Sequence, residues 1–568
     1  MKRNLDKLTN VSYDLIVIGG GIFGICTAWE AILRGLSVAL VEKADFGHAT
    51  SASCFKMVHG GMRYLQHGDV VRLRESARER SILLRIAPHL VHPLPIVVPT
   101  YGYGKNSKAF LATGLFLYDL LTWDRNRHIK DPDRQIPLTR LFTRDEILHH
   151  FPGIERHGLS GAVVFCDGQM YSPQRLALSF LLSAADAGVT AANYVKAESI
   201  LIADDRVIGV RAQDLITDRH FEIRGQTVLN AAGPWTEGLL NSEHNLTLKP
   251  RSTFSRDAYF TTQRCLHQDL ALAVQARTRD PDALLSRSAR HLFLVPWRGG
   301  TIVGVWHVVH QGGPEQFAVT ENDLKGFLDE INWAYPSLKL ELSEVSRFDA
   351  GLVLFGENDP EVTDLSYGKR SRIVDHAREH GVEGLLSLIG IRYTTARGDA
   401  EKVVDLMLRK MGRMAPRSNS DSTPVYGGDI ENVSRLIEQA IDRWRSHLDP
   451  EVITELVRHH GKEYQRVTQY LAEEPKWSER IGNSSVIAAE VVHAVRSEMA
   501  LTLNDIVFRR TTLGATEHPE LDDIAACANI MAHEMGWDAG RTRAEIKAVE
   551  QSLRENCPAM APSMDTPQ

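Results

Sequence analysis

Three glycines near the start of the chain, Gly19-x-Gly21-x-x-Gly24, lie between the apolar run DLIVIGG and the segment IFGICTAWEAILRG. The run predicts a buried strand and the segment predicts a helix. Glycines at such a junction permit a tight turn, a close approach of a pyrophosphate to the backbone and close packing of helix on strand. The next strand, LSVALVEK, contains Glu42, which is placed to accept hydrogen bonds from ribose hydroxyls. Residues 14–43 therefore predict one βαβ unit that binds a dinucleotide.

Length, net charge and cysteine spacing indicate a multidomain protein and disfavour nucleic-acid binding and a zinc site. A chain of 568 residues is too long for one hydrophobic core, so we expect two or three domains. The net charge of −7 disfavours a nucleic-acid binder, which would carry a basic excess. The six cysteines form no C-x-x-C pair and no zinc spacing. This pattern is typical of free thiols in a reducing compartment and predicts no metal site.

The apolar stretches bear on localisation. The segment MKRNLDKLTNVSYD has no apolar region of the kind found in secretory signals, and no run of about eighteen apolar residues occurs. We therefore expect a cytoplasmic protein. The stretch SKAFLATGLFLYDLLTW, over 107–123, has its large side chains at helical spacing. This spacing favours a buried helix over one that dips into a membrane surface.

Alternating strand and helix patterns divide the rest of the chain. Short runs between about 186 and 235 predict a small β-meander that returns to the buried strand TVLNAAG. The pattern of 246–355 predicts a mostly antiparallel sheet, and 356–415 returns to a strand–turn–helix pattern. Residues 418–429, rich in Ser, Asp, Gly and Thr, predict a linker. Helical periodicity then dominates 425–560.

Five segments relate the chain to a known family. ATSASCFKMVHGGMRYL, NAAGPW, LVPWRGGTIVG, GIRYTTAR and DIVFRRTTLG occur in this order. Together they resemble the FAD-dependent glycerol-3-phosphate dehydrogenases of the D-amino-acid-oxidase-like flavoprotein superfamily, over nearly the whole chain. The resemblance implies an α/β fold with a Rossmann-like FAD-binding domain formed by 13–245 and 356–415. It also implies an antiparallel-sheet substrate-binding domain over 246–355 and an all-helical C-terminal domain over 425–560.

The resemblance implies that several remote segments hold the FAD, a choice over NAD that the glycine pattern alone does not make. Residues matching Thr50, Ser51 and Ser53 contact the flavin in the family, and the alternative for each is an ordinary turn residue. The glycine pair after His59 would let the backbone lie against the isoalloxazine. His59 itself is either a flavin contact or an interior histidine, and the interior role is favoured. The expected cofactor-binding residues are Gly19, Gly21, Ile22, Phe23, Gly24, Glu42, Lys43, Thr50, Ser51, Ser53, His59, Gly60, Gly61, Val195, Ala232, Gly233, Trp235, Gly390, Arg392, Tyr393 and Thr394.

Three arginines and a tyrosine are the candidates for holding the substrate. Arg63 follows the glycine pair, where a guanidinium can clamp an anionic group with two hydrogen bonds. The alternative for Arg63 is a surface ion pair. By resemblance Tyr64 belongs to the same element. Arg370 and Arg392 match further substrate- or flavin-facing positions, and Arg392 replaces the family's usual lysine.

The chain departs from the family where the substrate is expected. Asp257 stands where the family carries a histidine, and Val353 stands where it carries a substrate-binding arginine. His307 lies in a segment that also differs. We expect Asp257 and His307 to be the candidate catalytic bases. The cations that lie near enough in sequence to replace the missing arginine are Arg251, Arg256 and Arg347.

The resemblance implies a dehydrogenase that transfers a hydride from a carbinol carbon of glycerol 3-phosphate, or of a similar small anionic alcohol, to flavin N5. Electrons would then pass to a quinone or another acceptor. Peripheral contact with the inner face of the cell membrane and a homodimer are both compatible with this interpretation. The alternatives are another polyol phosphate, a hydroxy acid or a phosphonate as substrate, a flavin amine oxidase, and a catalytically silent flavoprotein.

Overall fold

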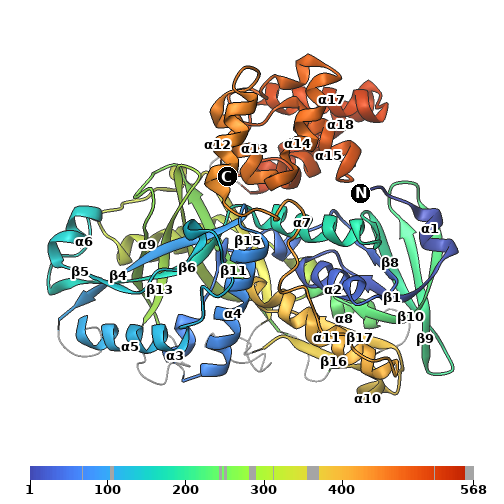
Figure 1. Ribbon diagram of the computed structural model, residues 1–568, viewed down its shortest axis with the longest axis horizontal. Coiled ribbons are helices and arrows are strands. Elements are labelled where there is room, and N and C mark those ends of the chain that lie inside the picture. The colour runs from blue at the N-terminus through green and yellow to red at the C-terminus, as the bar shows by residue number, and fades with distance from the viewer. Residues whose placement is uncertain are drawn as a thin grey trace, which may run out of the picture.

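The computed structural model places two β-sheets side by side beneath a helical domain (Figure 1). It describes residues 1–66, 68–102, 108–241, 246–248, 253–279, 289–310, 312–354, 370–516 and 518–556. Within these ranges, the structure does not describe the side chains of Arg63, Gln66, Thr278, Arg279 and Ala289.

The first sheet has a parallel centre in the order β17-β10-β1-β2-β7. In β1, Leu15 and Val17 pack towards helix α2, whereas Ile16 and Ile18 pack towards the meander of β8 and β9. Because both faces are covered, the strand is apolar at every position from Leu15 to Ile18, as the sequence predicted. The strands are β1 (Ser12–Ile18), β2 (Val38–Val41), β7 (Thr190–Ala192), β8 (Val195–Ala203), β9 (Arg206–Asp214), β10 (Arg219–Asn230), β16 (Arg372–Asp375) and β17 (Leu385–Ile389).

Three helices form one layer on this sheet. α2 (Ile22–Leu33) lies between α7 (Pro173–Asp186) and α11 (Ala396–Lys410) and packs against both. Their apolar residues share one core with the sheet residues that point the same way. The expected βαβ unit, meander and returning strand–turn–helix segment are therefore confirmed. The shorter helices beside this sheet are α1 (Leu5–Asn10), α8 (Thr236–Asn241) and α10 (His376–His380).

The second sheet runs in the order β15-β11-β14-β13-β12-β4-β6-β3, with β5 paired to β6. All its neighbours are antiparallel except β12 and β4, which are parallel. The sheet was predicted to lie within residues 246–355. It extends beyond that range, because β4 and β6, from the N-terminal third of the chain, pair with its strands at the β12 edge. Its strands are β3 (Met57–Val58), β4 (Val91–Tyr101), β5 (Arg140–Phe142), β6 (Leu159–Met170), β11 (Phe254–Thr262), β12 (Ala271–Arg279), β13 (Ala289–Trp297), β14 (Gly300–His310) and β15 (Arg347–Leu354).

Helix α5 (Lys108–Leu121) differs from its expected burial. Only Leu115 and Tyr118 are buried, whereas Phe116 is 71% exposed and Leu120 is 60% exposed. Trp123, just beyond the helix, is 76% exposed. The prediction of a buried helix was wrong, because the sheet covers only one side of α5. The other helices around this sheet are α3 (Met62–Gln66), α4 (Val70–Ile86), α6 (Arg144–His150) and α9 (Glu321–Ala334).

No helix within the described part of the chain is long and apolar enough to cross a membrane.

The C-terminal domain is helical, as expected, and lies above both sheets in Figure 1. A π-helical turn, Ile506–Arg510, joins it to the first sheet. From this turn Arg510 donates two hydrogen bonds to the buried Asp45, at 2.7 and 2.8 Å, and Arg509 donates a third at 2.6 Å. The helices are α12 (Val433–Trp444), α13 (Pro450–His460), α14 (Tyr464–Thr468), α15 (Ala488–Ser497), α16 (Leu503–Asp505), α17 (Leu521–Met535) and α18 (Ala539–Glu555).

A second buried polar cluster joins the same domain to α7. Arg175 of α7 lies 2.6 Å from the Glu498 carboxylate and donates to His460 Nδ1 at 3.0 Å. The Glu490 carboxylate lies 3.5 Å from the other nitrogen of His460. Burial raises the pKa of Glu490 to about 8. Arg175 supplies the one permanent positive charge of this cluster, and Glu498 balances it.

Glu490→Gln is expected to change how stability depends on pH. The folded protein keeps a proton on Glu490 that the unfolded chain releases above its ordinary pKa of 4.5, so this carboxyl destabilises the fold increasingly as pH rises from there to about 8. Glutamine mimics the protonated acid. The advantage of the variant should therefore grow by up to about 1.4 kcal/mol per pH unit within that window. Melting temperatures of the variant and the wild type at about pH 5, 6, 7 and 8 measure this difference in stability across the titration.

Glu438→Gln, at an exposed position of α12 in the same domain, is the matched control. An advantage of Glu490→Gln that stays constant across the pH range, or shrinks as pH rises, would contradict the assignment of a neutral Glu490.

Candidate functional site

A cavity of about 1920 Å³ lies where the two sheets meet. Its lining includes parts of both sheets and of α5. It brings together most of the residues expected from the sequence. The predicted residues that line it are Gly19, Gly21, Ile22, Phe23, Glu42, Lys43, Thr50, Ser51, Ser53, His59, Gly61, Tyr64, Val195, Ala232, Gly233, Trp235, Asp257, His307, Gly390, Arg392, Tyr393 and Thr394.

The glycine turn has the geometry of a nucleotide-binding loop. Gly19 has a φ of +108°, and a Cβ on Gly24 would lie 2.0 Å from the Gly19 carbonyl oxygen, so both positions require glycine. Glu42 accepts from the Gly20 N–H at 2.6 Å, and burial raises the pKa of its carboxyl. At the start of α2, the Ile22 N–H donates to Ser51 Oγ at 3.0 Å. Ser51 thus lies where a phosphate is expected, which supports a role beyond that of a turn residue.

Two further contacts shape this end of the cavity. Lys43 Nζ lies 4.0 Å from the centre of the Trp235 ring, which brings together two predicted cofactor residues from β2 and the turn after β10. A Cβ on Gly390 would lie 2.0 Å from the Phe23 ring, so that ring packs directly on the glycine backbone. These segments are far apart in sequence but form one wall.

Buried polar groups hold the backbone of the segment His59–Gly61 in place. The Gly60 N–H donates to Asp167 Oδ1 at 2.6 Å, and the Tyr118 hydroxyl donates to the Gly60 carbonyl at 3.1 Å. A Cβ on Gly60 would lie 2.1 Å from an Arg80 nitrogen. The expected reason for this glycine was incomplete, because Gly60 is required for packing on α4 and is not part of the cavity lining.

His59 is not the interior histidine that the sequence favoured. Its side chain is 52% exposed and lines the cavity, with Nδ1 3.7 Å from Asp167 Oδ2. Its backbone N–H donates to Thr394 Oγ1 at 3.1 Å. Sequence reasoning missed Asp167, since it lies in β6, a strand that was not assigned to this site.

The two candidate bases are in direct contact. Asp257 in β11 and His307 in β14 are cross-strand partners, and His307 Nδ1 lies 2.7 Å from Asp257 Oδ1. Ser255 Oγ also bonds to this carboxylate. Val353 faces Ser255 from β15 and lines the cavity at the position of the family's arginine.

Two of the three cations proposed to replace that arginine, Arg256 and Arg347, do not line the cavity. Arg256 donates to the Ala318 carbonyl at 2.6 Å and pairs with Asp323, because it points to the opposite face of the strand from Asp257. Arg347 pairs with Asp349 at 2.8 Å and donates to the Gly514 carbonyl. Arg251 lies outside the described residues.

Of the candidate substrate residues, Arg392 and Tyr64 are brought together. Arg392 donates to the Tyr64 hydroxyl at 3.2 Å and to Ser76 Oγ at 2.7 Å. Arg370 is exposed and does not line the cavity. Arg63 lies in the first turn of α3, but its side chain lies outside the described residues. Sequence reasoning missed Arg290 of β13, which does line the cavity.

Lys56 was also missed, although it lies within the segment that carries the family resemblance. It is buried and donates from Nζ to the Tyr259 hydroxyl at 2.6 Å. Its ammonium lies 4.2 Å and 4.4 Å from the centres of the Tyr259 and Trp297 rings. Burial lowers the pKa of Lys56 to about 8, although Asp349 opposes the shift. Lys56 thus supports Tyr259, whose side chain forms part of the cavity wall.

A nucleotide-binding glycine turn that opens into one cavity with histidine–aspartate pairs is typical of an oxidoreductase that uses a dinucleotide cofactor. The family model of "FAD dependent oxidoreductase" proteins matches residues 14–396, and that of the "C-terminal domain of alpha-glycerophosphate oxidase" matches 418–542. The chain belongs to the FAD-dependent glycerol-3-phosphate dehydrogenase family of these oxidoreductases, and its cofactor is FAD.

Two curated relatives and one solved structure match along nearly their whole length. A glycerol-3-phosphate dehydrogenase of Synechocystis is 30% identical over 560 residues, which cover 98% of this chain and 99% of the relative. An aerobic glycerol-3-phosphate dehydrogenase of Staphylococcus aureus is 26% identical, covering 98% and 96%. The crystal structure of the Bacillus halodurans glycerol-3-phosphate dehydrogenase with FAD has a TM-score of 0.77 at 22% identity, covering 98% and 97%. The last likeness confirms the fold.

The residues present fit FAD. Gly19 and Gly21 line the cavity with backbone alone, Ser51 Oγ lies at the start of α2, and the Glu42 carboxylate lies beside the glycine turn. The cavity is large enough for a dinucleotide together with a small substrate.

Proposed function

We propose that the protein oxidises glycerol 3-phosphate, or a similar small anionic alcohol, at the carbinol carbon. When bound, FAD supplies the acceptor for the hydride, at N5 of its ring system. The observation that carries the proposal is the contact between His307 and Asp257 inside the cavity that also contains the FAD-binding segments. A base in this cavity removes the hydroxyl proton, which makes release of the hydride from the same carbon easier.

His307 is the proposed proton acceptor and Asp257 the group that orients it. Because Nδ1 faces the Asp257 carboxylate at 2.7 Å, Nε2 is the ring nitrogen suited to accept a proton. The carboxylate then stabilises the imidazolium that forms. Ser255 holds the carboxylate from the neighbouring position on the same face of β11.

The anionic end of the substrate is assigned to Arg392 and Tyr64, with Arg63 and Arg370 as further candidates. Arg392 carries a guanidinium into the cavity from the segment that leads into α11. Arg290 adds a second positive group to the lining. Val353 supports the alternatives of another polyol phosphate, a hydroxy acid or a phosphonate, because the family's arginine is missing there. Oxidation of an amine is the remaining alternative.

An apolar arm of the cavity supports a quinone as electron acceptor. Phe110, Leu111, Leu115 and Leu117 of α5 line the same cavity as the nucleotide-binding loop. The facing wall is also apolar and includes Ile96, Val98, Val163 and Phe165. An isoprenoid quinone has the low polarity that such walls accept.

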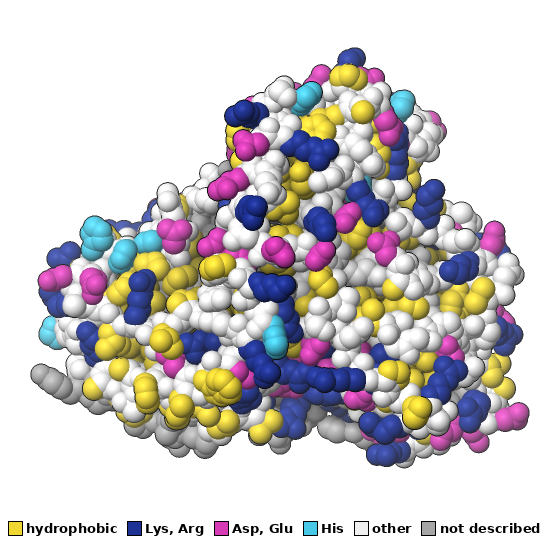
Figure 2. Space-filling view, viewed as in Figure 1, with side chains coloured by type: hydrophobic (Ala, Val, Ile, Leu, Met, Phe, Trp, Pro, Cys, Tyr) yellow, Lys and Arg dark blue, Asp and Glu magenta, His cyan; other side chains and the backbone are white. Residues whose placement is uncertain are grey.

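The outer surface of α5 supports contact with a membrane. Hydrophobic side chains gather over the lower left of the molecule in Figure 2, where α5 lies. Phe116, Leu120 and Trp123 are 71%, 60% and 76% exposed, and contiguous apolar surface of this kind marks interaction sites. We therefore place the protein in the cytoplasm, at the inner face of the cell membrane.

His307→Gln and Asp257→Asn are expected to lower kcat for glycerol 3-phosphate by about 10²–10⁴-fold, because the first removes the base and the second removes the carboxylate that orients it. KM should change much less, since neither residue is assigned to the anionic end. Steady-state kinetics with an artificial acceptor measure both constants. His310→Gln is the matched control, as His310 lies on the same strand but is only half-buried and does not line the cavity.

His59→Gln tests the second histidine–aspartate pair in the same assay. If His307→Gln keeps the wild-type kcat while His59→Gln loses it, the assignment of the base to His307 is wrong.

Replacing Phe116, Leu120 and Trp123 by serine should weaken binding to phospholipid vesicles by at least about tenfold, because three large apolar side chains no longer enter the lipid. Vesicle sedimentation measures the bound fraction. The control replaces Leu215, Ile216 and Trp333 by serine, which are 45%, 49% and 52% exposed and lie in the turn after β9 and in α9. Equal binding by the two triple variants would contradict membrane contact through α5.

A further inference from the structure

A second cavity, of about 790 Å³, lies between α4 and α11 and shares no lining residue with the cavity described above. Its remaining walls are the turn that follows α5 and the chain before α12. We call it the arginine recess. Its basic lining residues are Arg74, Arg78, Arg85, Arg125, Arg127, His128, Arg397, Lys402 and Arg417.

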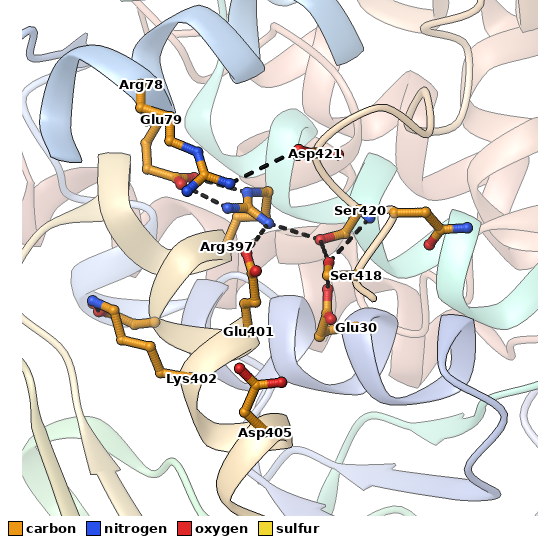
Figure 3. Close-up of polar contacts among 12 residues, drawn as sticks. Glu30, Arg78, Glu79, Arg397, Glu401, Lys402, Asp405, Ser418, Ser420 and Asp421 are labelled. Atoms are coloured by element: carbon orange, nitrogen blue, oxygen red, sulfur yellow. Dashed lines mark hydrogen bonds and ion pairs between the residues drawn. The ribbon is translucent and has the colours of Figure 1, made fainter. Parts of the chain in front are cut away.

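The floor of the arginine recess is a buried and fully paired arginine. Arg397 donates to both oxygens of Glu79, at 2.6 and 2.8 Å, and both side chains are almost completely buried. Arg397 also bonds to Ser420 Oγ at 2.8 Å and to Glu401 at 3.0 Å (Figure 3). These contacts fix the floor, and their charges largely cancel.

Most carboxylates that line the arginine recess form ion pairs. Glu75 binds Lys402 at 2.5 Å and also contacts Arg392. Arg392 lines the first cavity, which we call the FAD cavity. The other close pairs are Asp124 with Arg74 at 2.6 Å, Asp405 with Arg34 at 2.6 Å and Glu401 with Arg397 at 3.0 Å. Because Arg397 also balances Glu79, two lining carboxylates of the described chain, Glu401 and Asp421, are left to offset the remaining arginines of the rim.

The rim therefore has a net positive charge, because four of its arginines face only these two carboxylates in the described chain. Arg78 lies 3.8 Å from Asp421, at the limit of an ion pair, and its side chain is 59% exposed. Arg85 donates only to backbone carbonyls, those of Asp421 and Arg127. Arg127 and Arg417 are exposed and have no carboxylate within 4.0 Å in the described parts of the chain.

Figure 2 agrees with this distribution. Basic side chains gather in the middle of the lower half of the molecule, between the places that α4 and α11 occupy in Figure 1. A concave site rimmed by several guanidinium groups suits an anion with several oxygens, because each group offers two parallel N–H donors.

We propose that the arginine recess binds the phosphate group of a second ligand, distinct from the substrate of the FAD cavity. A soluble phosphorylated metabolite and the headgroup of an anionic phospholipid share this chemistry. The ligand would rest on α4 and α11. Both helices also serve the FAD cavity, α4 through Ser76 and Glu75, which contact Arg392, and α11 because it follows the segment Tyr393–Thr395.

The test uses the FAD-bound protein and pyrophosphate as probe. The recess variant carries Arg78→Gln, Arg127→Gln and Arg417→Gln, three changes at exposed positions that preserve the buried floor. The control carries Arg435→Gln, Arg443→Gln and Arg445→Gln, an equal loss of charge on and beside α12. Isothermal titration calorimetry should give a Kd at least about tenfold higher for the recess variant than for the wild type and the control.

A parallel measurement distinguishes the two sources of phosphate. If pyrophosphate binding is lost only in the recess variant, a soluble ligand is supported. If instead only binding to vesicles containing phosphatidylglycerol falls, relative to phosphatidylcholine vesicles, the occupant is a lipid headgroup. If the recess variant matches the control in both measurements, including the case in which pyrophosphate binds equally at the FAD cavity, the proposal is overturned. Because binding is read directly, this outcome is independent of which alcohol the enzyme oxidises.

Discussion

The buried contact between Arg80 and Asp167 determines the geometry on which the FAD cavity depends. Asp167 Oδ1 accepts from Arg80 at 2.7 Å and from the Gly60 N–H at 2.6 Å. One carboxylate therefore joins α4, β6 and the segment that carries His59. Removing one partner of a buried ion pair costs about 3–5 kcal/mol, since the other charge loses its compensation. The second sheet, the glycine pair and α4 are thus positioned together.

Helix α4 consequently has different contacts on its different sides. Arg80 faces the glycine pair, Ser76 contacts Arg392 of the FAD cavity, and Glu79 pairs with Arg397 on the floor of the arginine recess. Its neighbour α11 starts directly after the cavity-lining segment that contains Thr394. The two cavities therefore share supporting helices while differing in chemistry: one is mostly apolar with a few placed polar groups, and the other is rimmed by arginine.

The sequence predicted what depends on local pattern. The glycine turn, the βαβ unit around it and the helical C-terminal domain follow from apolar periodicity and glycine placement. The contact between Asp257 and His307 did not follow, because it depends on the register of two strands that are separate in sequence. The same limit applied to Asp167, which reaches the site only because β6 joins the second sheet through β4. The exposure of α5 was missed for a different reason, since helical spacing of apolar residues does not reveal whether anything covers the second face.

The most direct test of the proposed reaction is anaerobic mixing of the FAD-bound protein with glycerol 3-phosphate while the flavin absorbance is followed. If the protein oxidises this alcohol, the absorbance of oxidised flavin should disappear rapidly, because no acceptor is present to remove the electrons. If the absorbance persists while dithionite still bleaches it, glycerol 3-phosphate is not the substrate. The loss of the family's arginine at Val353 would then mark a change of substrate.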